Sequence, residues 1–246
     1  MPPNRVLPPD VDPQTLARTV RKGRGAATNA AGRFEANQHE AADDGWGGFD
    51  EPLPTVATTV AVDTARTIIS RNDSPDIPFD QSINPYRGCE HGCVYCYARP
   101  THAYLGLSPG VDFETKLYTK PDAAAMLRAE LRAPNYRPKV IALGANTDPY
   151  QPIERRYRVT RSILEVLSEC EHPVTIVTKS ARIERDLDLL APMAKKNLVQ
   201  VYLSVTTLDR DLARRLEPRA SAPAQRIEAM QSLHAAGVPV GVMSAP

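Results

Sequence analysis

Short apolar segments alternate with amphipathic helical segments from about residue 66 to the end of this 246-residue chain. Ile183, Leu187 and Leu190 fall on one helical face, and Ile163 and Leu167 repeat the same spacing. We expect strands at 67–70, 82–87, 139–145, 174–178, 198–206 and 238–243, and helices at 121–132, 161–170, 183–196 and 224–236. Alternation of this kind specifies an α/β fold with a parallel sheet and right-handed crossovers.

The first 65 residues lack this periodicity and are rich in proline, glycine, alanine, asparagine and charge. We therefore expect a mostly disordered N-terminal extension at 1–65, followed by a core domain at 66–246. Two interpretations stay open for its basic residues: a solvated tail, or a cover for the active site or a phosphate backbone. These basic residues are Arg21, Lys22, Arg24 and Arg33. Trp46 and Phe49 are candidates for anchoring the extension to the core.

Three cysteines, Cys89, Cys93 and Cys96, lie in one short segment with steps of four and three residues. At roughly 3.3 to 3.6 Å per extended residue, their thiols can reach a single soft metal centre. Three thiolates are one fewer than usually hold an iron-sulfur cluster or a structural zinc, so one metal position is open to water or substrate. The alternative is a closed zinc site in which His91 or His102 supplies the fourth ligand.

The spacing Cys-x3-Cys-x2-Cys, with Tyr95 directly before the third cysteine, resembles the signature of the radical S-adenosylmethionine (radical SAM) enzymes. Further segments resemble the subgroup related to spore photoproduct lyase, which is DNA-repair-photolyase-like. These segments are 21–26, 32–35, 79–89, 146–152 and 178–180. The resemblance extends over roughly residues 20–246.

This resemblance implies two cofactors, a [4Fe-4S] cluster on Cys89, Cys93 and Cys96 and S-adenosylmethionine chelating the fourth iron. Reductive cleavage would yield a 5′-deoxyadenosyl radical for hydrogen abstraction from an unidentified substrate. A low-potential electron donor of the flavodoxin or ferredoxin type is an implied partner, and nucleic acid is a candidate one. The implied fold is a partial, TIM-like (βα)6 barrel. Because the chain stops just after the fifth strand, we expect this barrel to be truncated.

Three residues resemble side chains that serve the cofactor or the radical in this family, and a fourth, Ser204, could assist one of them. Lys179 resembles a lysine that holds the methionyl carboxylate, and Ser204 offers a hydroxyl to the same group. Tyr95 resembles an aromatic residue near the adenine. Tyr97 matches a tyrosine that photoproduct lyases use in radical relay. The alternatives are a solvated strand end for Lys179 and ordinary packing for Tyr95.

Asn146, Thr147 and Asp148 follow the second strand, where many relatives carry a Gly-Gly-Glu segment that accepts hydrogen bonds from the methionyl amine. This chain departs from that pattern. The three side chains still offer acceptors at a strand end, and Asp148 could meet the ammonium directly. A turn built on the pair Asp148 and Pro149 is the alternative.

The fourth cysteine, Cys170, belongs to the apolar face of the helix expected at 161–170, so we expect a small buried hydrophobe. Photoproduct lyases carry a cysteine near the end of the second strand that returns a hydrogen atom to the product radical. Here 142–146 contains no thiol, so we expect S-adenosylmethionine cleavage without efficient repair of spore photoproduct. We expect a solvated, charged surface to be formed by Glu154, Arg155, Arg156 and Arg158.

The charge balance and cysteine usage narrow the function classes. Thirty basic and 29 acidic residues give a net charge of +1, so the chain as a whole lacks the excess of basic residues that is typical of nucleic-acid-binding proteins. Clustered cysteines favour a metal site in a reducing compartment over a disulfide framework. The chain starts without an apolar signal core and has no run of membrane-spanning length, so we expect a cytoplasmic protein without membrane association. The rivals to an enzyme are a zinc-binding structural module and an inactive fragment.

Overall fold

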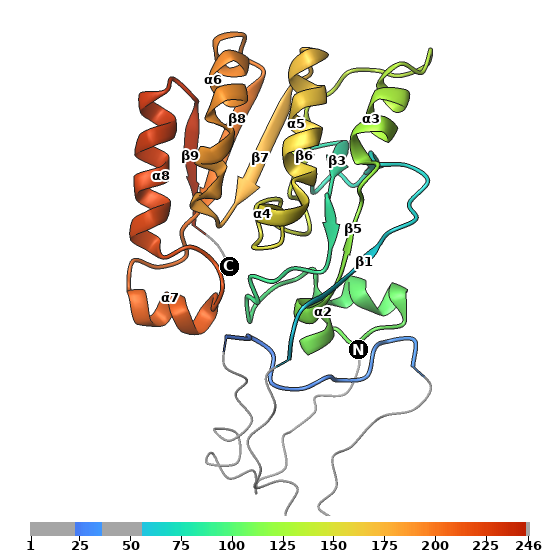
Figure 1. Ribbon diagram of the computed structural model, residues 1–246, viewed down its shortest axis with the longest axis vertical. Coiled ribbons are helices and arrows are strands. Elements are labelled where there is room, and N and C mark those ends of the chain that lie inside the picture. The colour runs from blue at the N-terminus through green and yellow to red at the C-terminus, as the bar shows by residue number, and fades with distance from the viewer. Residues whose placement is uncertain (1–22, 36–55, 245–246) are drawn as a thin grey trace, which may run out of the picture.

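A six-stranded sheet forms the centre of the computed structural model, which describes residues 23–35 and 56–244 (Figure 1). Its strand order is β2-β3-β6-β7-β8-β9, and every neighbouring pair from β3 to β9 is parallel. The bounds are β2 Ser70–Arg71, β3 Gln81–Ile83, β6 Ile141–Leu143, β7 Val174–Thr178, β8 Val199–Ser204 and β9 Val240–Met243. The predicted α/β fold with a parallel sheet is confirmed. Within the described residues the sheet is open, with β2 and β9 at its edges.

Helices connect the parallel strands. They are α3 Ala123–Leu131, α4 Glu154–Tyr157, α5 Val159–Glu169, η2 Ala181–Asp186, α6 Leu187–Lys195, α7 Arg210–Leu216 and α8 Pro223–Ala235. In Figure 1 the longer helices α3, α5, α6 and α8 lie together on one side of the sheet, whereas α7 lies beyond the carboxyl ends of the strands. In α5 the inward face holds Ile163, Leu164, Val166 and Leu167, none of which is exposed to solvent. The apolar periodicity of the sequence therefore predicts the core-facing side of α5 correctly.

A second, three-stranded sheet of order β1-β5-β4 lies beside the first. It comprises β1 Thr59–Val62, β5 Lys116–Thr119 and β4 Tyr86–Arg87, and it adjoins η1 Arg99–Leu105 and α2 Val111–Thr115. The single strand expected at 82–87 is wrong in its second half, because β4 pairs with β5 and not with β6. Pro85 lies between β3 and β4, and its missing N–H cannot continue a ladder.

Two expectations about side-chain exposure are also wrong. Cys170 is exposed, because α5 ends before it and it forms the C-cap instead of part of the inward face. Glu154 has no solvent exposure and accepts hydrogen bonds from the Tyr86 hydroxyl and, at 3.0 Å, from the Thr160 backbone N–H. Arg185 completes the pair with Glu154 at 2.7 Å. Glu154 is therefore a buried hydrogen-bond acceptor inside the fold, although its neighbours in the sequence are arginines.

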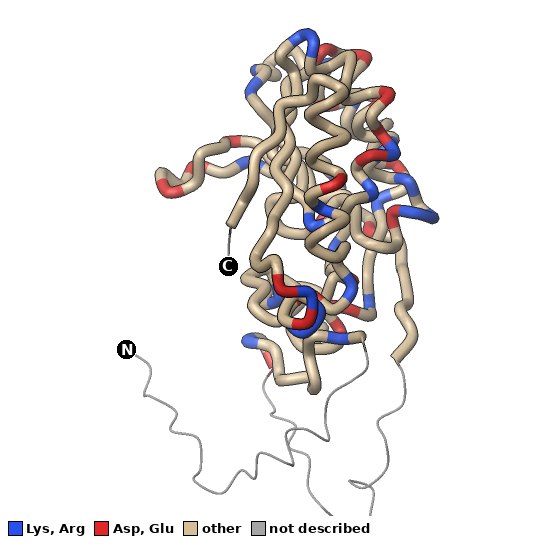
Figure 2. Tube along the Cα trace, turned by 90° about the vertical axis from the view of Figure 1, so that its left-hand side faces the viewer, with Lys and Arg blue, Asp and Glu red and all other residues tan. Residues whose placement is uncertain are grey.

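The remaining expectations concern the extension and membranes. Part of the segment at 1–65 is described, and β1 within it pairs in parallel with β5. Arg21, Lys22, Trp46 and Phe49 lie outside the described residues. No helix in the described part of the chain is both long and apolar enough to cross a membrane. In the view of Figure 2, basic and acidic residues are interspersed along the chain, in keeping with the net charge of +1.

Ile176 in the central strand β7 tests the position of the core. Its side chain has no solvent exposure, so Ile176→Ala should lower the free energy of unfolding by about 2 to 5 kcal/mol through lost burial and a residual cavity. The measurement is urea denaturation of the metal-free protein. Leu208→Ala is the control, because Leu208 is 71% exposed and its loss should change stability by less than about 0.5 kcal/mol. Equal effects of the two substitutions would contradict this placement of the core.

Candidate metal and cofactor site

The three clustered cysteines lie in the loop that follows β4. Cys89 and Cys93 are buried, at 7% and 9% exposure, and Cys96 is half-buried. The loop begins at Gly88, whose φ of +74° is a left-handed conformation, and a Cβ there would lie 2.5 Å from Leu117 Cδ2. Only glycine combines this backbone angle with this close packing. The Cys89 N–H then donates to the Phe113 carbonyl at 2.9 Å, which fixes the first thiol against α2.

Two other parts of the fold hold the same loop. The Gln151 side chain accepts from the Glu90 N–H at 2.9 Å and donates to the Gly88 carbonyl at 3.1 Å. From the side of α7, the Leu216 carbonyl accepts from the Val94 N–H at 3.0 Å. Backbone hydrogen bonds on both sides give the cysteine loop a defined shape before any metal binds.

Burial dominates the acid–base properties of the thiols. It raises the pKa of Cys93 to about 12, although the charge of Lys179 acts in the opposite direction. It also raises the pKa of Cys89 well above its usual value, with the charge of Asp148 and of the two other thiolates adding to the effect. When ionised, the thiolates of Cys93 and Cys96 disfavour the charged form of Cys89. A metal cation supplies the positive charge that thiolates at such a site require.

Each of the two histidines that a zinc site would need has one ring nitrogen near an oxygen of another part of the fold, while His102 Nδ1 is buried without a hydrogen-bond partner among the described residues. His102 Nε2 lies 2.9 Å from the Lys116 carbonyl oxygen, and its ring packs edge-on against Phe113. His91 Nδ1 lies 3.2 Å from Asp148 Oδ2. Among the described residues no three Cys, His, Asp or Glu side chains, the three cysteines included, are grouped as a metal ion would hold them, so neither histidine completes a closed zinc site with the cysteines. The zinc interpretation receives no support from these contacts.

Asp148 lies at the carboxyl end of β6 and links the sheet to the cysteine loop. Its carboxylate accepts from the Lys179 N–H and the Thr178 hydroxyl, both at 2.7 Å, and from the Tyr150 N–H at 2.8 Å. Burial alone would raise the pKa of Asp148, but the charge and hydrogen bond of His91, together with the bonds from the Lys179 N–H and the Thr178 hydroxyl, outweigh it and lower the pKa to about 2. Asp148 is therefore an ionised carboxylate with hydrogen-bond donors inside the protein.

Thr147 and Asn146 differ in what they offer to a ligand. The Thr147 side chain is buried and donates to the Tyr86 carbonyl at 2.8 Å. The Asn146 side chain is exposed, while its N–H donates to Asn84 Oδ1 at 2.8 Å. Of the three residues predicted after the second strand, Asn146 is the one whose side chain faces outward.

Lys179 and Ser204, predicted from two different strands, lie together. Lys179 Nζ donates to Ser204 Oγ at 2.9 Å and lies 5.8 Å from the ring centroid of Tyr95. Tyr95 thus approaches from the cysteine loop, and the ammonium of Lys179 contributes positive charge beside Cys93. Tyr97 is 74% exposed, and its hydroxyl donates to the Ala145 carbonyl at the carboxyl end of β6. The carboxyl edges of β6, β7 and β8 therefore meet the cysteine loop, as expected for a parallel α/β fold.

Glu217 and Arg226 belong to this group and were missed by the sequence reasoning. Glu217 is 3% exposed and accepts from the Tyr95 hydroxyl, from Thr206 Oγ1 at 2.8 Å and from the Arg226 guanidinium. Burial raises the pKa of Glu217, but the hydrogen bond from Tyr95 and the charge of Arg226 outweigh this and lower it. Lys179 Nζ lies 4.0 Å from the same carboxylate, so Glu217 joins Tyr95 to Lys179.

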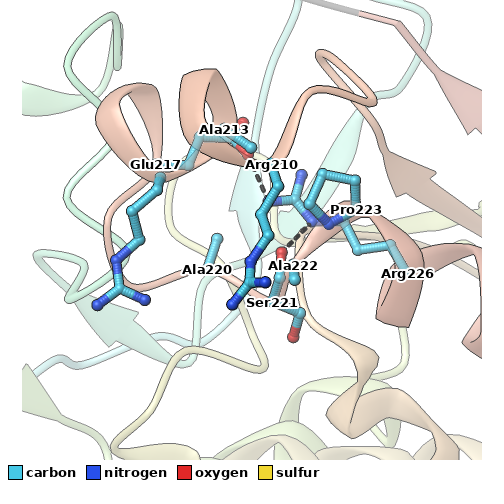
Figure 3. A pocket seen from close by; sticks show the side chains of 9 residues that line it. Arg210, Ala213, Glu217, Ala220, Ser221, Ala222, Pro223 and Arg226 are labelled. Carbon is cyan, nitrogen blue, oxygen red and sulfur yellow. Dashed lines mark hydrogen bonds and ion pairs between the residues drawn. The ribbon is translucent and has the colours of Figure 1, made fainter.

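Arg226 lies in the first turn of α8 and lines a pocket together with Glu217 (Figure 3). It is 1% exposed and donates to the carbonyls of Ser204 and Ser221, each at 2.7 Å. One signal for it exists in the sequence: Arg226 shares a helical face with Ala229 and Leu233, both fully buried. A charged residue on a core-facing stripe indicates a buried ion pair.

A profile of the radical SAM superfamily matches residues 83–245. The chain belongs to the radical SAM superfamily. The match includes the cysteine loop, both Lys179 and Ser204, and every strand from β6 to β9. Radical SAM enzymes use a [4Fe-4S] cluster and S-adenosylmethionine. Three free thiols in one short loop are the kind of ligand that such a cluster takes, so the donor chemistry of the loop fits it.

Two relatives give the extent of the sequence similarity. An uncharacterized protein of Mycobacterium tuberculosis H37Rv is 43% identical over 170 residues, which are 69% of this chain and 50% of the relative. An uncharacterized protein of Methanocaldococcus jannaschii is 27% identical over 156 residues, 63% of this chain and 56% of the relative. The chain spans about half the length of the curated relatives it matches.

Spore photoproduct lyase structures share the fold. The lyase complexed with dinucleoside spore photoproduct has a TM-score of 0.54 at 19% identity, over 76% of this chain and 51% of that chain. A doubly substituted lyase with bound AdoMet and dinucleoside spore photoproduct has a TM-score of 0.52 at 21% identity, over 76% of this chain and 50% of that chain. At these identities the similarity establishes the fold of the radical SAM domain.

The lowered pKa of Glu217 predicts a pH-dependent contribution to stability. A carboxylate whose pKa is lower in the folded state stabilises the fold above its unfolded value of 4.5, and this contribution is lost as pH falls through the folded value. Glu217→Gln should therefore be less stable than wild type at pH 7, because Arg226 is left buried without its partner, and the difference should shrink below pH 4.5. The measurement is denaturant unfolding of both proteins at several pH values. A difference that stays constant down to pH 3 would contradict the assignment.

Proposed function

We propose that this protein is a radical SAM enzyme in which Cys89, Cys93 and Cys96 hold the [4Fe-4S] cluster. The observation that carries the proposal is the arrangement of these thiols in one clamped loop beside Lys179 and Ser204 at the carboxyl edge of the sheet. When bound, the cluster supplies the electron for cleavage of S-adenosylmethionine to a 5′-deoxyadenosyl radical, which abstracts hydrogen from a substrate. The binding groups come from the loop and from β6, β7 and β8.

Each predicted residue has a proposed role toward S-adenosylmethionine. Lys179 and Ser204 bind the methionyl carboxylate through a charge-assisted hydrogen bond and a hydroxyl. Glu217 holds Tyr95 in place, so that the Tyr95 ring is fixed where the adenine would pack. Asn146 offers an outward-facing amide to the amine, whereas Thr147 and Asp148 hold the turn behind it.

Tyr97 is the proposed radical relay. Its ring is the most exposed of the aromatic rings on the cysteine loop, and its hydroxyl is held at the carboxyl end of β6. The phenol of Tyr97 would lie between the bound cofactor and solvent, where it could contact a substrate. Cys170, by contrast, follows the last turn of α5, and the chain then enters β7 at its amino end. Cys170 therefore lies near the amino ends of the strands, whereas the cysteine loop lies at their carboxyl ends. This separation supports the expectation that this chain does not repair spore photoproduct efficiently.

The proposed partners follow from the reaction. A flavodoxin or ferredoxin supplies the low-potential electron, and the location is the reducing cytoplasm, where thiolate-bound clusters persist. The substrate is a molecule with an abstractable hydrogen. A nucleic acid is retained as a candidate because spore photoproduct lyase, complexed with a dinucleoside, shares the fold. The net charge of +1 gives this candidate no electrostatic support.

Metal content tests the ligand set. Anaerobically reconstituted protein should bind four iron and four sulfide per chain, as the [4Fe-4S] assignment requires, and replacing Cys89, Cys93 and Cys96 by Ala should abolish binding. Cys170→Ala is the matched control and should leave the cluster content unchanged, because this exposed thiol lies outside the loop. The measurement combines iron and sulfide analysis with the visible absorption spectrum. Stoichiometric zinc without sulfide would rule out the proposal.

Binding of S-adenosylmethionine tests Lys179. Lys179→Ala should weaken binding by about 1.5 to 3 kcal/mol, the usual contribution of a hydrogen bond to a charged group. The measurement is an anaerobic titration of cluster-loaded protein. Lys196→Ala is the matched control, since Lys196 is an exposed lysine paired with Glu171. Unchanged affinity in Lys179→Ala, at full cluster content, would refute the assignment.

A further inference from the structure

An N-terminal segment that the proposed function leaves unused lies against the cysteine loop. Residues 23–32, here called the strap, run beside α2, as the blue trace in Figure 1 shows. The Thr28 carbonyl accepts from the Val111 N–H at 3.2 Å. Asn29 and Asp112 exchange two hydrogen bonds of 2.9 Å. These contacts attach the strap to the first turn of α2.

The buried carboxylate of Glu114 is the main contact between the strap and the site. Its side chain has no solvent exposure and accepts from the Gly25 N–H at 2.9 Å and the Ala26 N–H at 2.8 Å. The Arg99 guanidinium donates to the same carboxylate at 2.6 Å. Burying a carboxylate is costly unless its oxygens are bonded, so Glu114 requires the strap to stay docked.

Arg99 carries this contact to a metal ligand. Its Nε and one NH2 group donate to the Cys93 carbonyl at 3.1 and 2.8 Å. A second connection starts at Arg24, which is 8% exposed and donates to Thr58 Oγ1 at 3.0 Å. The Thr58 hydroxyl donates to Glu90 at 2.5 Å, in the loop between Cys89 and Cys93. The strap is thus joined to the loop on two sides.

The backbone of the strap also touches the loop directly. A Cβ placed on Gly25 would lie 1.8 Å from the Gly92 carbonyl oxygen and 2.9 Å from its carbon. Real side chains do not approach a backbone this closely, so position 25 accepts only glycine while the strap is docked. Arg24, buried and bonded inside the fold, serves neither as part of a solvated tail nor as a contact to a phosphate backbone.

We propose that the strap is a component of the metal centre, in which Glu114 is the positioning residue that couples residues 25 and 26 to Cys93 through Arg99. The docked strap fixes the shape of the loop and covers it from solvent, which slows access to Cys93 and retains the cluster. The statement about the cluster rests on the proposed function. The statement about Cys93 concerns the apoprotein and does not depend on it.

Gly25→Ala is the variant that tests docking, because it introduces the collision with Gly92 and changes no residue of the loop. Gly23→Ala is its matched control in the same strap: a Cβ there meets nothing within 4 Å, so this substitution strains the backbone at its φ of +71° without the collision with Gly92. The apoprotein is treated under reducing conditions with iodoacetamide, and the rate of modification is followed for each cysteine by peptide mass spectrometry. Exposed Cys170 serves as the internal reference.

Gly25→Ala should raise the rate at Cys93 by about tenfold or more, the change expected on loss of one charged hydrogen bond, whereas Gly23→Ala should leave it near the wild-type rate. Glu114→Ala should act like Gly25→Ala, and Glu114→Gln, which keeps one acceptor oxygen, should be intermediate. Unchanged rates at Cys93 would overturn the proposal. Equal acceleration at Cys89, Cys93 and Cys96 together with a lower melting temperature would also overturn it, because this pattern marks a general loss of fold.

Iron release provides the second readout. Cluster-loaded Gly25→Ala should lose iron to a ferrous chelator about tenfold faster than wild type and Gly23→Ala, for the same physical reason. Equal release rates in all three proteins would contradict the role of the strap in retention. If wild type takes up no cluster at all, the proposed function fails, and the alkylation rates of the apoprotein still decide whether the strap covers Cys93.

Discussion

The carboxylate of Asp148 joins the sheet to the cysteine loop, and the geometry of the site depends on this junction. It receives hydrogen bonds from the end of β7 and from the turn after β6, and it lies 3.2 Å from His91 in the loop. The pKa of about 2 keeps Asp148 ionised at neutral pH. Because a buried ionised group must keep its partners, the loop and the strand ends are held in one arrangement.

Two further buried carboxylates hold the other sides of the same loop. Glu114 lies under the strap and holds Arg99, and Glu217 holds Tyr95 with the help of Arg226. Each carboxylate has its own hydrogen-bond donors, from a cationic side chain or from backbone N–H groups. None of them therefore needs a metal ion to balance its charge. In such a preformed frame the thiolates are the groups whose negative charge a bound metal would compensate.

The sequence predicts the parallel strands and the cysteine ligands because both depend on local patterns. The strand at 174–178 has its expected bounds, and the lysine that follows it meets Ser204 of the neighbouring strand as the order of a parallel sheet requires. Glu154 and Cys170 were misplaced because their burial depends on where a helix begins and ends. Glu114 and Glu217 were missed because a carboxylate bonded to residues about 90 or 122 positions away has no local signature.

Formation of 5′-deoxyadenosine tests the central claim most directly. Cluster-loaded protein is incubated anaerobically with S-adenosylmethionine and dithionite, and the nucleoside is quantified by chromatography. Wild type should produce 5′-deoxyadenosine even without its natural substrate, and Cys96→Ala should produce none. A wild-type protein that carries the full cluster and binds S-adenosylmethionine, yet releases no 5′-deoxyadenosine under reductant, would contradict the account.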